Sequence, residues 1–278
     1  MADSNKSTAG IHYDQSTSEA YSLYRPLWTD TIVGRVMDYV GEKLPGPPTQ
    51  AIDVGCGTGQ FTTMLAPYFQ RVIGLDPSPY QVENANKGCV PPNVTYQVGN
   101  AEKLPVPNDS ADLVTAATAA HWFDMNDFYK ESARILRPNG CLAVLYYDVI
   151  PDIHGSSNGD AIKRLLDEYF ILLQDRNMWV EPAETNYVTH FARDVDAPFP
   201  KPFVDYTRED SLDIKKDISV SEILGYVKSW SSTGNLMKTC SDAGSILERL
   251  ESSLRALWPD SHLITVTHPV WVRMARKS

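Results

Sequence analysis

The run from Ala51 to Gly59, AIDVGCGTG, constrains the fold of this chain more than any other segment. Its apolar start is typical of a buried strand, and the glycines that follow allow a tight turn against which a ligand can lie. The next residues, Phe61 to Tyr68, predict a helix whose first amides face that ligand. Gln60 stands where the dinucleotide fingerprint G-x-G-x-x-G requires its last glycine, so that fingerprint is not met.

A second short apolar strand, Arg71 to Asp76, ends in an acid about 20 residues after the glycine turn. A carboxylate at this place accepts hydrogen bonds from ribose hydroxyls, although Asp76 could also cap the helix that follows. A third strand is expected over 94–98, before GNAEKLP at 99–105, and a fourth over 111–116, before TAAHWFD at 118–124. The alternation continues to a fifth strand at 141–147, which predicts a parallel sheet with right-handed crossovers.

Together, the glycine turn, the acid of the second strand, GNAEKLP and TAAHWFD resemble the class I S-adenosylmethionine-dependent methyltransferases. With the pattern Tyr21-x-x-x-Arg25-Pro26, they are similar to the methyltransferase type 11, trans-aconitate methyltransferase-like family, which acts on small molecules. The resemblance covers about residues 11–147. Beyond them it rests mainly on VKSWS at 227–231, where this chain has serine in place of the usual threonine.

The resemblance implies that the chain binds S-adenosyl-L-methionine and releases S-adenosyl-L-homocysteine. Asn100 and the amide of Ala101 would lie beside the adenine, and Arg25 would pair with the methionine carboxylate. The residues expected to contact the cofactor are Tyr21, Arg25, Asp53, Gly55, Gly57, Gly59, Asp76, Asn100, Ala101 and Thr118.

For the methyl acceptor, the resemblance favours a carboxylate, which is ionised at neutral pH and needs no base. Trp122, through its indole N–H, and Gln15, through its amide, would hold the carboxylate oxygens. His121 could instead act as a general base for an alcohol or a protonated amine. The candidate catalytic residues are therefore Trp122, His121 and Gln15. Strand alternation turns either Tyr146 or Tyr147 toward the acceptor and leaves open which one.

The later part of the chain carries a surplus of aromatic residues, namely Trp179, Tyr187, Phe191, Tyr226 and Trp230. Each could belong to the core of a cap, but together they favour an acceptor with an apolar body, and Trp230 is expected to contact it. The predicted function is O-methylation of a small acid. The alternatives are N- or C-methylation of an amine, heterocycle or quinone-like ring with His121 as base, and a non-catalytic relative that only binds the cofactor.

The expected fold is α/β: a Rossmann-like, mostly parallel seven-stranded twisted sheet with helices on both faces and a mainly helical cap over its carboxyl edge. Residues 1–10 are expected to be a disordered tail, and 11–278 a single methyltransferase domain. That domain would consist of N-terminal lid helices (11–48), a cofactor-binding core (49–150), a cap with late sheet elements (151–262), and the last strand and tail (263–278). Helical patterns lie at 28–40, 160–174, 220–231 and 245–257, and further strand patterns at 203–214 and 263–272.

The acidic balance of the chain limits its partners. A formal net charge of −10 and a pI near 5.0 disfavour nucleic acid, and the basic run at 273–277 is expected to be a solvated terminus. No apolar run approaches the length of a membrane span, and no secretory signal is indicated. The cysteines are expected to be small buried residues of a reduced compartment, and the histidines show no metal-ligand spacing. We therefore expect a cytoplasmic monomer or homodimer without a metal site.

Overall fold

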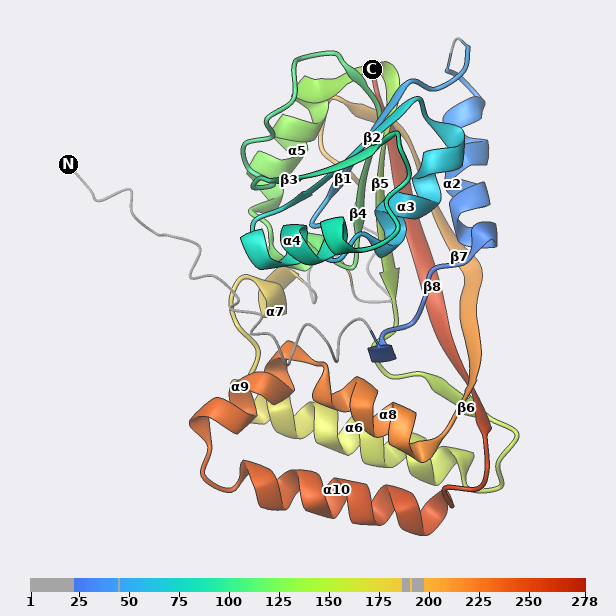
Figure 1. Cartoon of the computed structure of the whole chain (residues 1–278), viewed down its shortest axis with the longest axis vertical. Helices are drawn as coiled ribbons and strands as arrows, with labels where there is room; N and C mark the ends of the chain where they lie inside the picture. Colours follow the sequence, from blue (N-terminus) through green and yellow to red (C-terminus); the bar gives the residue numbers. More distant parts are fainter. Residues whose placement is uncertain (1–22, 45, 187–190, 192–197) are drawn as a thin grey trace, which may run out of the picture.

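The computed structural model describes residues 23–44, 46–186, 191 and 198–278 (Figure 1). The tail expected at 1–10 and three of the residues singled out in the sequence, Gln15, Tyr21 and Tyr187, lie outside these ranges. Their expected roles stay predictions.

Among the described residues, eight strands form one mixed sheet in the order β3-β2-β1-β4-β5-β8-β6, and β7 pairs with the other edge of β8. The strands are β1 (Gln50–Val54), β2 (Arg71–Asp76), β3 (Val94–Val98), β4 (Ala111–Ala117), β5 (Leu136–Tyr147), β6 (Asp152–His154), β7 (Phe203–Ile218) and β8 (Ile264–Lys277). The first five run parallel, and β8 runs antiparallel to its partners. The Rossmann-like sheet is confirmed, but the expected number of seven strands is wrong. The additional strand, β6, is too short to show a periodic pattern in the sequence.

Helices cover both faces of the parallel part of the sheet. They are α2 (Asp30–Gly41), α3 (Gln60–Leu65), α4 (Pro79–Lys87) and α5 (Met125–Ile135), with the short 3-10 turns η1 (Ala66–Tyr68) and η2 (Ala120–Trp122). The first three pack on one face and α5 packs on the other. Because both faces are covered, β1 and β4 are buried along almost their whole length, as their continuous apolar sequences require.

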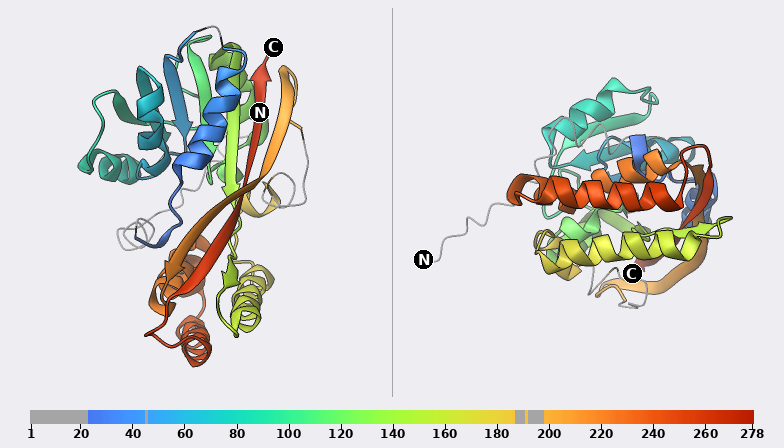
Figure 2. Two further views of the ribbon diagram at one scale, coloured as in Figure 1. Left: turned by 90° about the vertical axis from the view of Figure 1, so that its right-hand side faces the viewer. Right: turned by 90° about the horizontal axis from the view of Figure 1, so that it is seen from below.

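A separate helical cap lies beyond the carboxyl ends of the parallel strands (Figure 1). Its helices are α6 (Gly159–Asp175), α8 (Val220–Lys228), α9 (Ser231–Thr239) and α10 (Ala243–Leu257), and the short α7 (Ala183–Asn186) lies between α6 and β7 in the chain. These four longer helices share their own hydrophobic core, which includes Leu166, Leu224 and Trp258. The long strands β7 and β8 run from the sheet into the cap, where Ile218 and Ile264 join that core (Figure 2).

The basic run near the end of the chain is not a solvated terminus, which corrects the expectation from the sequence. β8 continues to Lys277, and the side chains of Arg273 and Arg276 are buried. Arg276 donates to the backbone carbonyl of Tyr39, pairs with Glu42 at 3.0 Å and lies over the Tyr39 ring at 4.0 Å. Both arginines are therefore part of the folded core.

Two smaller expectations are also wrong. The segment 220–231 forms two helices rather than one, because the amides of Ser229 and Trp230 close the end of α8 before α9 begins. Cys89 is exposed, whereas Cys56 and Cys141 are buried free thiols as expected.

Candidate functional site

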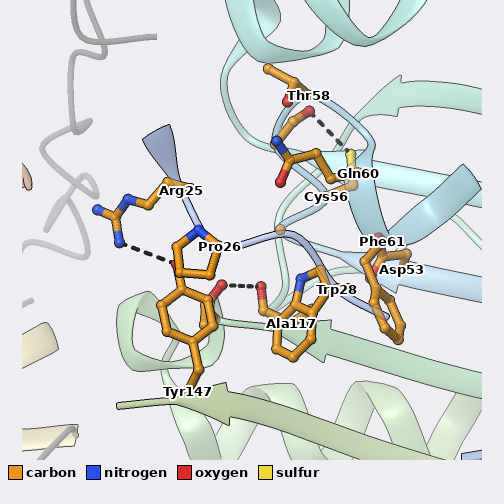
Figure 3. A pocket seen from close by; sticks show the side chains of 13 residues that line it. Arg25, Pro26, Trp28, Asp53, Cys56, Thr58, Gln60, Phe61, Ala117 and Tyr147 are labelled. Carbon is orange, nitrogen blue, oxygen red and sulfur yellow. Dashed lines mark hydrogen bonds between the residues drawn. The ribbon is translucent and has the colours of Figure 1, made fainter. Parts of the chain in front are cut away.

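The glycine turn after β1 forms a wall of a first cavity of about 420 Å³ (Figure 3). Gly57 has a φ of 54°, and no atom lies within 4 Å of the position that a Cβ would take. Gly59 has a φ of 85° and begins α3, and a Cβ there would lie within 2.8 Å of three atoms of Tyr96. Gly57 therefore leaves room for a ligand, whereas Gly59 leaves room for a neighbouring side chain.

The first cavity is built from the N-terminal segment, the glycine turn and the ends of β4 and β5. It is lined by Arg25, Pro26, Trp28, Asp53, Gly55, Cys56, Gly57, Thr58, Gln60, Phe61, Ala117, Thr118 and Tyr147. No atom lies where a Cβ of Gly57 would be, so this side of the turn leaves space for a ligand to lie against the main chain. Trp28 and Phe61, whose rings meet edge to face at 5.5 Å, add an aromatic wall that the motifs did not indicate.

Asp53 lies at the base of this cavity and is almost fully buried. Its two carboxylate oxygens accept hydrogen bonds from Thr62 at 2.6 Å and from Thr115 at 2.7 Å. Burial raises the pKa of Asp53 to about 6, although both threonine hydrogen bonds oppose that rise. The described contacts of this carboxylate thus hold β1, β4 and α3 together beneath the turn.

Asp76, at the end of β2, is attached directly to the glycine turn. One carboxylate oxygen accepts from the amide of Gly57 at 2.9 Å, and the other accepts from the amide of Ser78 at 2.9 Å. Burial raises its pKa, while these two backbone hydrogen bonds act in the opposite direction. Each oxygen retains a further lone pair, so the carboxylate can also accept from the hydroxyls of a bound ribose.

The residues expected at the cofactor divide into two groups. Arg25, Asp53, Gly55, Gly57 and Thr118 line the first cavity together. Gly59, Asp76, Asn100 and Ala101 do not line it; Ala101 is buried, and the Asn100 backbone carbonyl accepts from the amide of Lys103. The amide of Gly99 donates to the carbonyl of Asp76 at 3.1 Å, which keeps this second group next to the end of β2.

A second cavity of about 740 Å³ adjoins the first. It is lined by Arg25, Thr118, His121, Trp122, Tyr146, Tyr147, Val149, Trp179, Val180, Trp230, Ser231 and Ser232. The predicted acceptor residues His121, Trp122, Tyr146, Tyr147 and Trp230 are therefore brought together. The sequence did not single out Val149, Val180 or Ser232, and Ser231 was quoted only as the last residue of the segment VKSWS.

Arg25, Thr118 and Tyr147 line both cavities. The guanidinium of Arg25 donates to the Tyr147 hydroxyl at 3.4 Å and to the carbonyl of Ser229 at 3.2 Å, so it links the N-terminal segment to the sheet and the cap. Figure 3 shows the side chain of Arg25 above that of Tyr147 among the residues that line the first cavity. The guanidinium also lies over the Tyr226 ring, 5.5 Å from its centroid, and this cation–π contact helps to hold it at the junction.

Both tyrosines at the end of β5 reach the site, which answers the question that strand alternation left open. Tyr147 lines both cavities, whereas Tyr146 lines the second alone. The hydroxyl of Tyr146 accepts from the backbone N–H of His121 at 2.7 Å and lies 2.5 Å from Nδ1 of the same residue. The ring of Tyr146 stacks on Phe191 at 4.4 Å, which keeps it in place.

His121 lies in the turn η2 after β4, and Asn186 at the end of α7 donates to its backbone carbonyl at 3.0 Å. Burial of the imidazole, aided by the nearby charge of Arg25, lowers the pKa of His121 to about 3. The ring is therefore neutral at physiological pH. An imidazole of such low pKa is a poor proton acceptor, because an efficient general base has a pKa close to the working pH.

Two further properties concern only the part of the chain that the structure describes. No group of three or more histidine, cysteine, aspartate or glutamate side chains there has a metal-binding arrangement. None of the helices described has both the length and the apolar character needed to cross a membrane.

Comparisons with known proteins show the family and the fold of this chain. The profile of a family described as "Methyltransferase domain" matches residues 52–144. A Dictyostelium discoideum protein named "Putative methyltransferase" is 34% identical over 264 residues, which cover 94% of each chain. The solved structure of a "Putative Type II Methyltransferase" from Anaeromyxobacter dehalogenans has a TM-score of 0.68 and 28% identity, and the match covers 91% of this chain and 98% of that one. A Haemonchus contortus phosphoethanolamine N-methyltransferase 2, solved with phosphomonomethylethanolamine and S-adenosylhomocysteine, shares the fold with a TM-score of 0.50 and 17% identity, covering 95% of this chain and 57% of that one.

Proposed function

This chain belongs to the class I S-adenosylmethionine-dependent methyltransferases, with S-adenosylmethionine as its cofactor, and we propose that it methylates a carboxylate oxygen of a small acid with an apolar body. The observation that carries the proposal is the junction of the two cavities at Arg25, Thr118 and Tyr147. A cofactor on the glycine turn and an acceptor among the tryptophans would meet there.

The lining of the second cavity supports an apolar acceptor. Trp122, Trp179 and Trp230 come from η2, from the segment after α6 and from the start of α9, and they surround one space. Val149 and Val180 add aliphatic surface. Aromatic and aliphatic walls of this kind favour a ring or an alkyl chain over a highly charged acceptor.

The electrostatics of the second cavity support an anionic group on that acceptor. Among the described residues that line it, Arg25 is positively charged and none is acidic. Ser231 and Ser232 lie in the first turn of α9, and the N-terminal end of a helix favours negative charge. Trp122 would donate its indole N–H to a carboxylate oxygen, and Gln15, which lies outside the described residues, would supply a second donor.

A carboxylate is consistent with the chemistry that these residues can perform. Bound S-adenosylmethionine supplies a methyl group on a positively charged sulfur; the acceptor oxygen forms a bond to the methyl carbon as the carbon–sulfur bond breaks and its electron pair returns to sulfur. The acceptor needs orientation and exclusion of water rather than proton removal. The low pKa of His121 agrees with this requirement, since it makes the alternative role as general base for an amine or alcohol unfavourable.

The proposal places the chain among cytoplasmic enzymes that modify small molecules rather than nucleic acids. Its acidic net charge disfavours phosphate backbones, and its buried thiols Cys56 and Cys141 suit a reducing compartment. The expected monomer or homodimer stays a prediction.

The test is a screen with a labelled methyl donor and matched acceptors. Each set contains a carboxylic acid, a primary amine and an alcohol that share one aryl or alkyl body, and mass spectrometry locates the methyl group on the product. We expect methyl esters from acids with aromatic or medium-length alkyl bodies. Transfer only to nitrogen or carbon would contradict the carboxylate proposal, and transfer to no acceptor would favour a relative that only binds the cofactor.

A further inference from the structure

The turn η2 and the end of β5 bring together a pair of side chains whose hydrogen bonding has a chemical consequence. The Tyr146 hydroxyl oxygen lies 2.7 Å from the backbone nitrogen of His121 and 2.5 Å from its ring Nδ1. The backbone N–H can only donate, so the hydroxyl oxygen accepts one hydrogen bond from His121. The direction of the second hydrogen bond depends on whether the hydroxyl oxygen or Nδ1 carries the proton between them.

Two arguments assign that proton to the hydroxyl. The hydroxyl oxygen already accepts from the backbone N–H of His121 and has one proton of its own to donate, and Nδ1 lies within hydrogen-bond distance at 2.5 Å. A phenol is also a far stronger acid than the N–H of a neutral imidazole, so the hydroxyl is the better donor of the two. Nδ1 of His121 then accepts, and the single ring proton of the neutral imidazole resides on Nε2.

The pair is held rigidly, so this tautomer is a fixed property of the site. The Tyr146 ring stacks on Phe191 at 4.4 Å and on Trp271 at 6.2 Å. The backbone of His121 is tied to Asn186 at 3.0 Å, and its ring lies 5.0 Å from that of Trp122. The positive charge of Arg25 opposes a second proton on the ring, which keeps His121 neutral.

We propose that Tyr146 is a positioning residue that fixes His121 as the Nε2–H tautomer, and that His121 thereby presents a hydrogen-bond donor, not a base, to the methyl acceptor in the second cavity. Nδ1 is engaged with Tyr146, and no hydrogen bond joins Nε2 to another described residue. A donor at this place binds an oxygen that arrives with a free lone pair and negative charge. It gives no help to a protonated amine, so the pair discriminates between classes of acceptor. The assignment of the tautomer does not depend on the proposed function, whereas the class of acceptor rests on it.

The first test is nitrogen NMR of the full-length protein labelled with ¹⁵N-histidine and bound to S-adenosylhomocysteine. The His121 signals are assigned by their loss in His121→Gln. We expect a protonated Nε2 and an unprotonated, hydrogen-bonded Nδ1. In Tyr146→Phe the Nδ1 signal should move to the position of an unbonded ring nitrogen, whereas the matched control Tyr147→Phe should leave it in place. A proton on Nδ1 in the wild type, or an unchanged Nδ1 signal in Tyr146→Phe, overturns the proposal whatever the acceptor is.

The second test uses phenylacetate as the probe and measures its affinity by calorimetry in the presence of S-adenosylhomocysteine. The amide N–H of glutamine can occupy the place of Nε2–H, so we expect His121→Gln to weaken binding less than threefold and His121→Ala about tenfold, the loss of one hydrogen bond to a charged group. Equal losses in the two variants overturn the donor role. A wild type that does not bind phenylacetate counts against the acid as acceptor, and the NMR result then decides the tautomer separately.

Discussion

Gly57 and Gly59 are two residues apart in the same turn, and the structure predicts that alanine at each would have a different effect. Both have positive φ, so alanine at either position carries the cost of a left-handed conformation, about 1–2 kcal/mol. At Gly57 the added methyl group meets no atom within 4 Å and extends into open space beside the first cavity. Gly57→Ala should therefore lower the free energy of unfolding by only about 1–2 kcal/mol.

At Gly59 the methyl group would overlap the hydroxyl and ring of Tyr96, a buried side chain. Overpacking of this kind costs about 1–3 kcal/mol in addition to the conformational term. Gly59→Ala should therefore lower the free energy of unfolding by about 2–5 kcal/mol in total. Urea denaturation at neutral pH in the absence of ligand measures both values.

The two substitutions should affect ligand affinity in the opposite order: Gly57→Ala, which costs less stability, should weaken ligand binding more. Gly57→Ala places a methyl group in the space where the cofactor is expected to lie against the main chain, and should weaken S-adenosylhomocysteine at least tenfold by calorimetry. Gly59→Ala, measured at a temperature where it is still folded, should weaken the ligand less. Full cofactor affinity in a folded Gly57→Ala protein would refute the assignment of this turn to the cofactor.

Three other predictions concern single side chains. Asp76→Ala removes the carboxylate expected to accept from the ribose, so calorimetry should show cofactor binding weaker by about 1–3 kcal/mol, and unchanged affinity would contradict that role. Trp122→Ala should abolish methyl transfer while leaving cofactor affinity nearly intact, and a parallel loss of both would indicate that Trp122 supports the fold instead. The pKa of Asp53 is raised to about 6 by burial, so the folded state binds its proton more tightly than the unfolded state, and stability should fall as pH rises from about 4 to about 6 and then level off. The loss in the free energy of unfolding is about 3 kcal/mol at most. Denaturation of the wild type at pH 4 and pH 7 measures it, and Asp53→Asn, which has no carboxyl group at this position, should not show it.

The cofactor half of the site could be predicted because its signals are local. The glycine turn and the start of the 118–124 segment each follow a strand directly, and Asp76 is the last residue of one. Parallel strands bring their carboxyl ends to one edge of the sheet. The register of β1 against β2 places Asp53 opposite Gly74 and Val54 opposite Leu75, which brings the turn next to Asp76. The spacing of these segments therefore predicted that Asp76 lies beside the turn, whereas the identity of the cofactor came from the family resemblance.

The burial of the last strand could not be predicted in the same way. Arg273 and Arg276 read as a charged tail because their neighbours in the sequence, Lys277 and Ser278, end the chain. Arg273 contacts Tyr206 of β7, which pairs with β8, and Arg276 contacts Tyr39 and Glu42 at the end of α2, which packs against β8. These partners are 67 and more than two hundred positions away in the sequence, so no local pattern of hydrophobicity indicates the contacts.

The acceptor half of the site is likewise built from segments that lie far apart in the sequence, and this affects how the site can vary. Its walls come from the N-terminal segment, η2, the end of β5 and the cap, and the cap has a hydrophobic core of its own, separate from those of the sheet. Substitutions at exposed or cavity-facing positions such as Val180 or Ser231 can therefore reshape the second cavity without disturbing the glycine turn. Substitution of Arg25, Thr118 or Tyr147 would alter both cavities, because each of these residues lines both. We infer that the choice of acceptor can change through substitutions in the cap, while the place where methyl donor and acceptor meet is set by the sheet and the N-terminal segment.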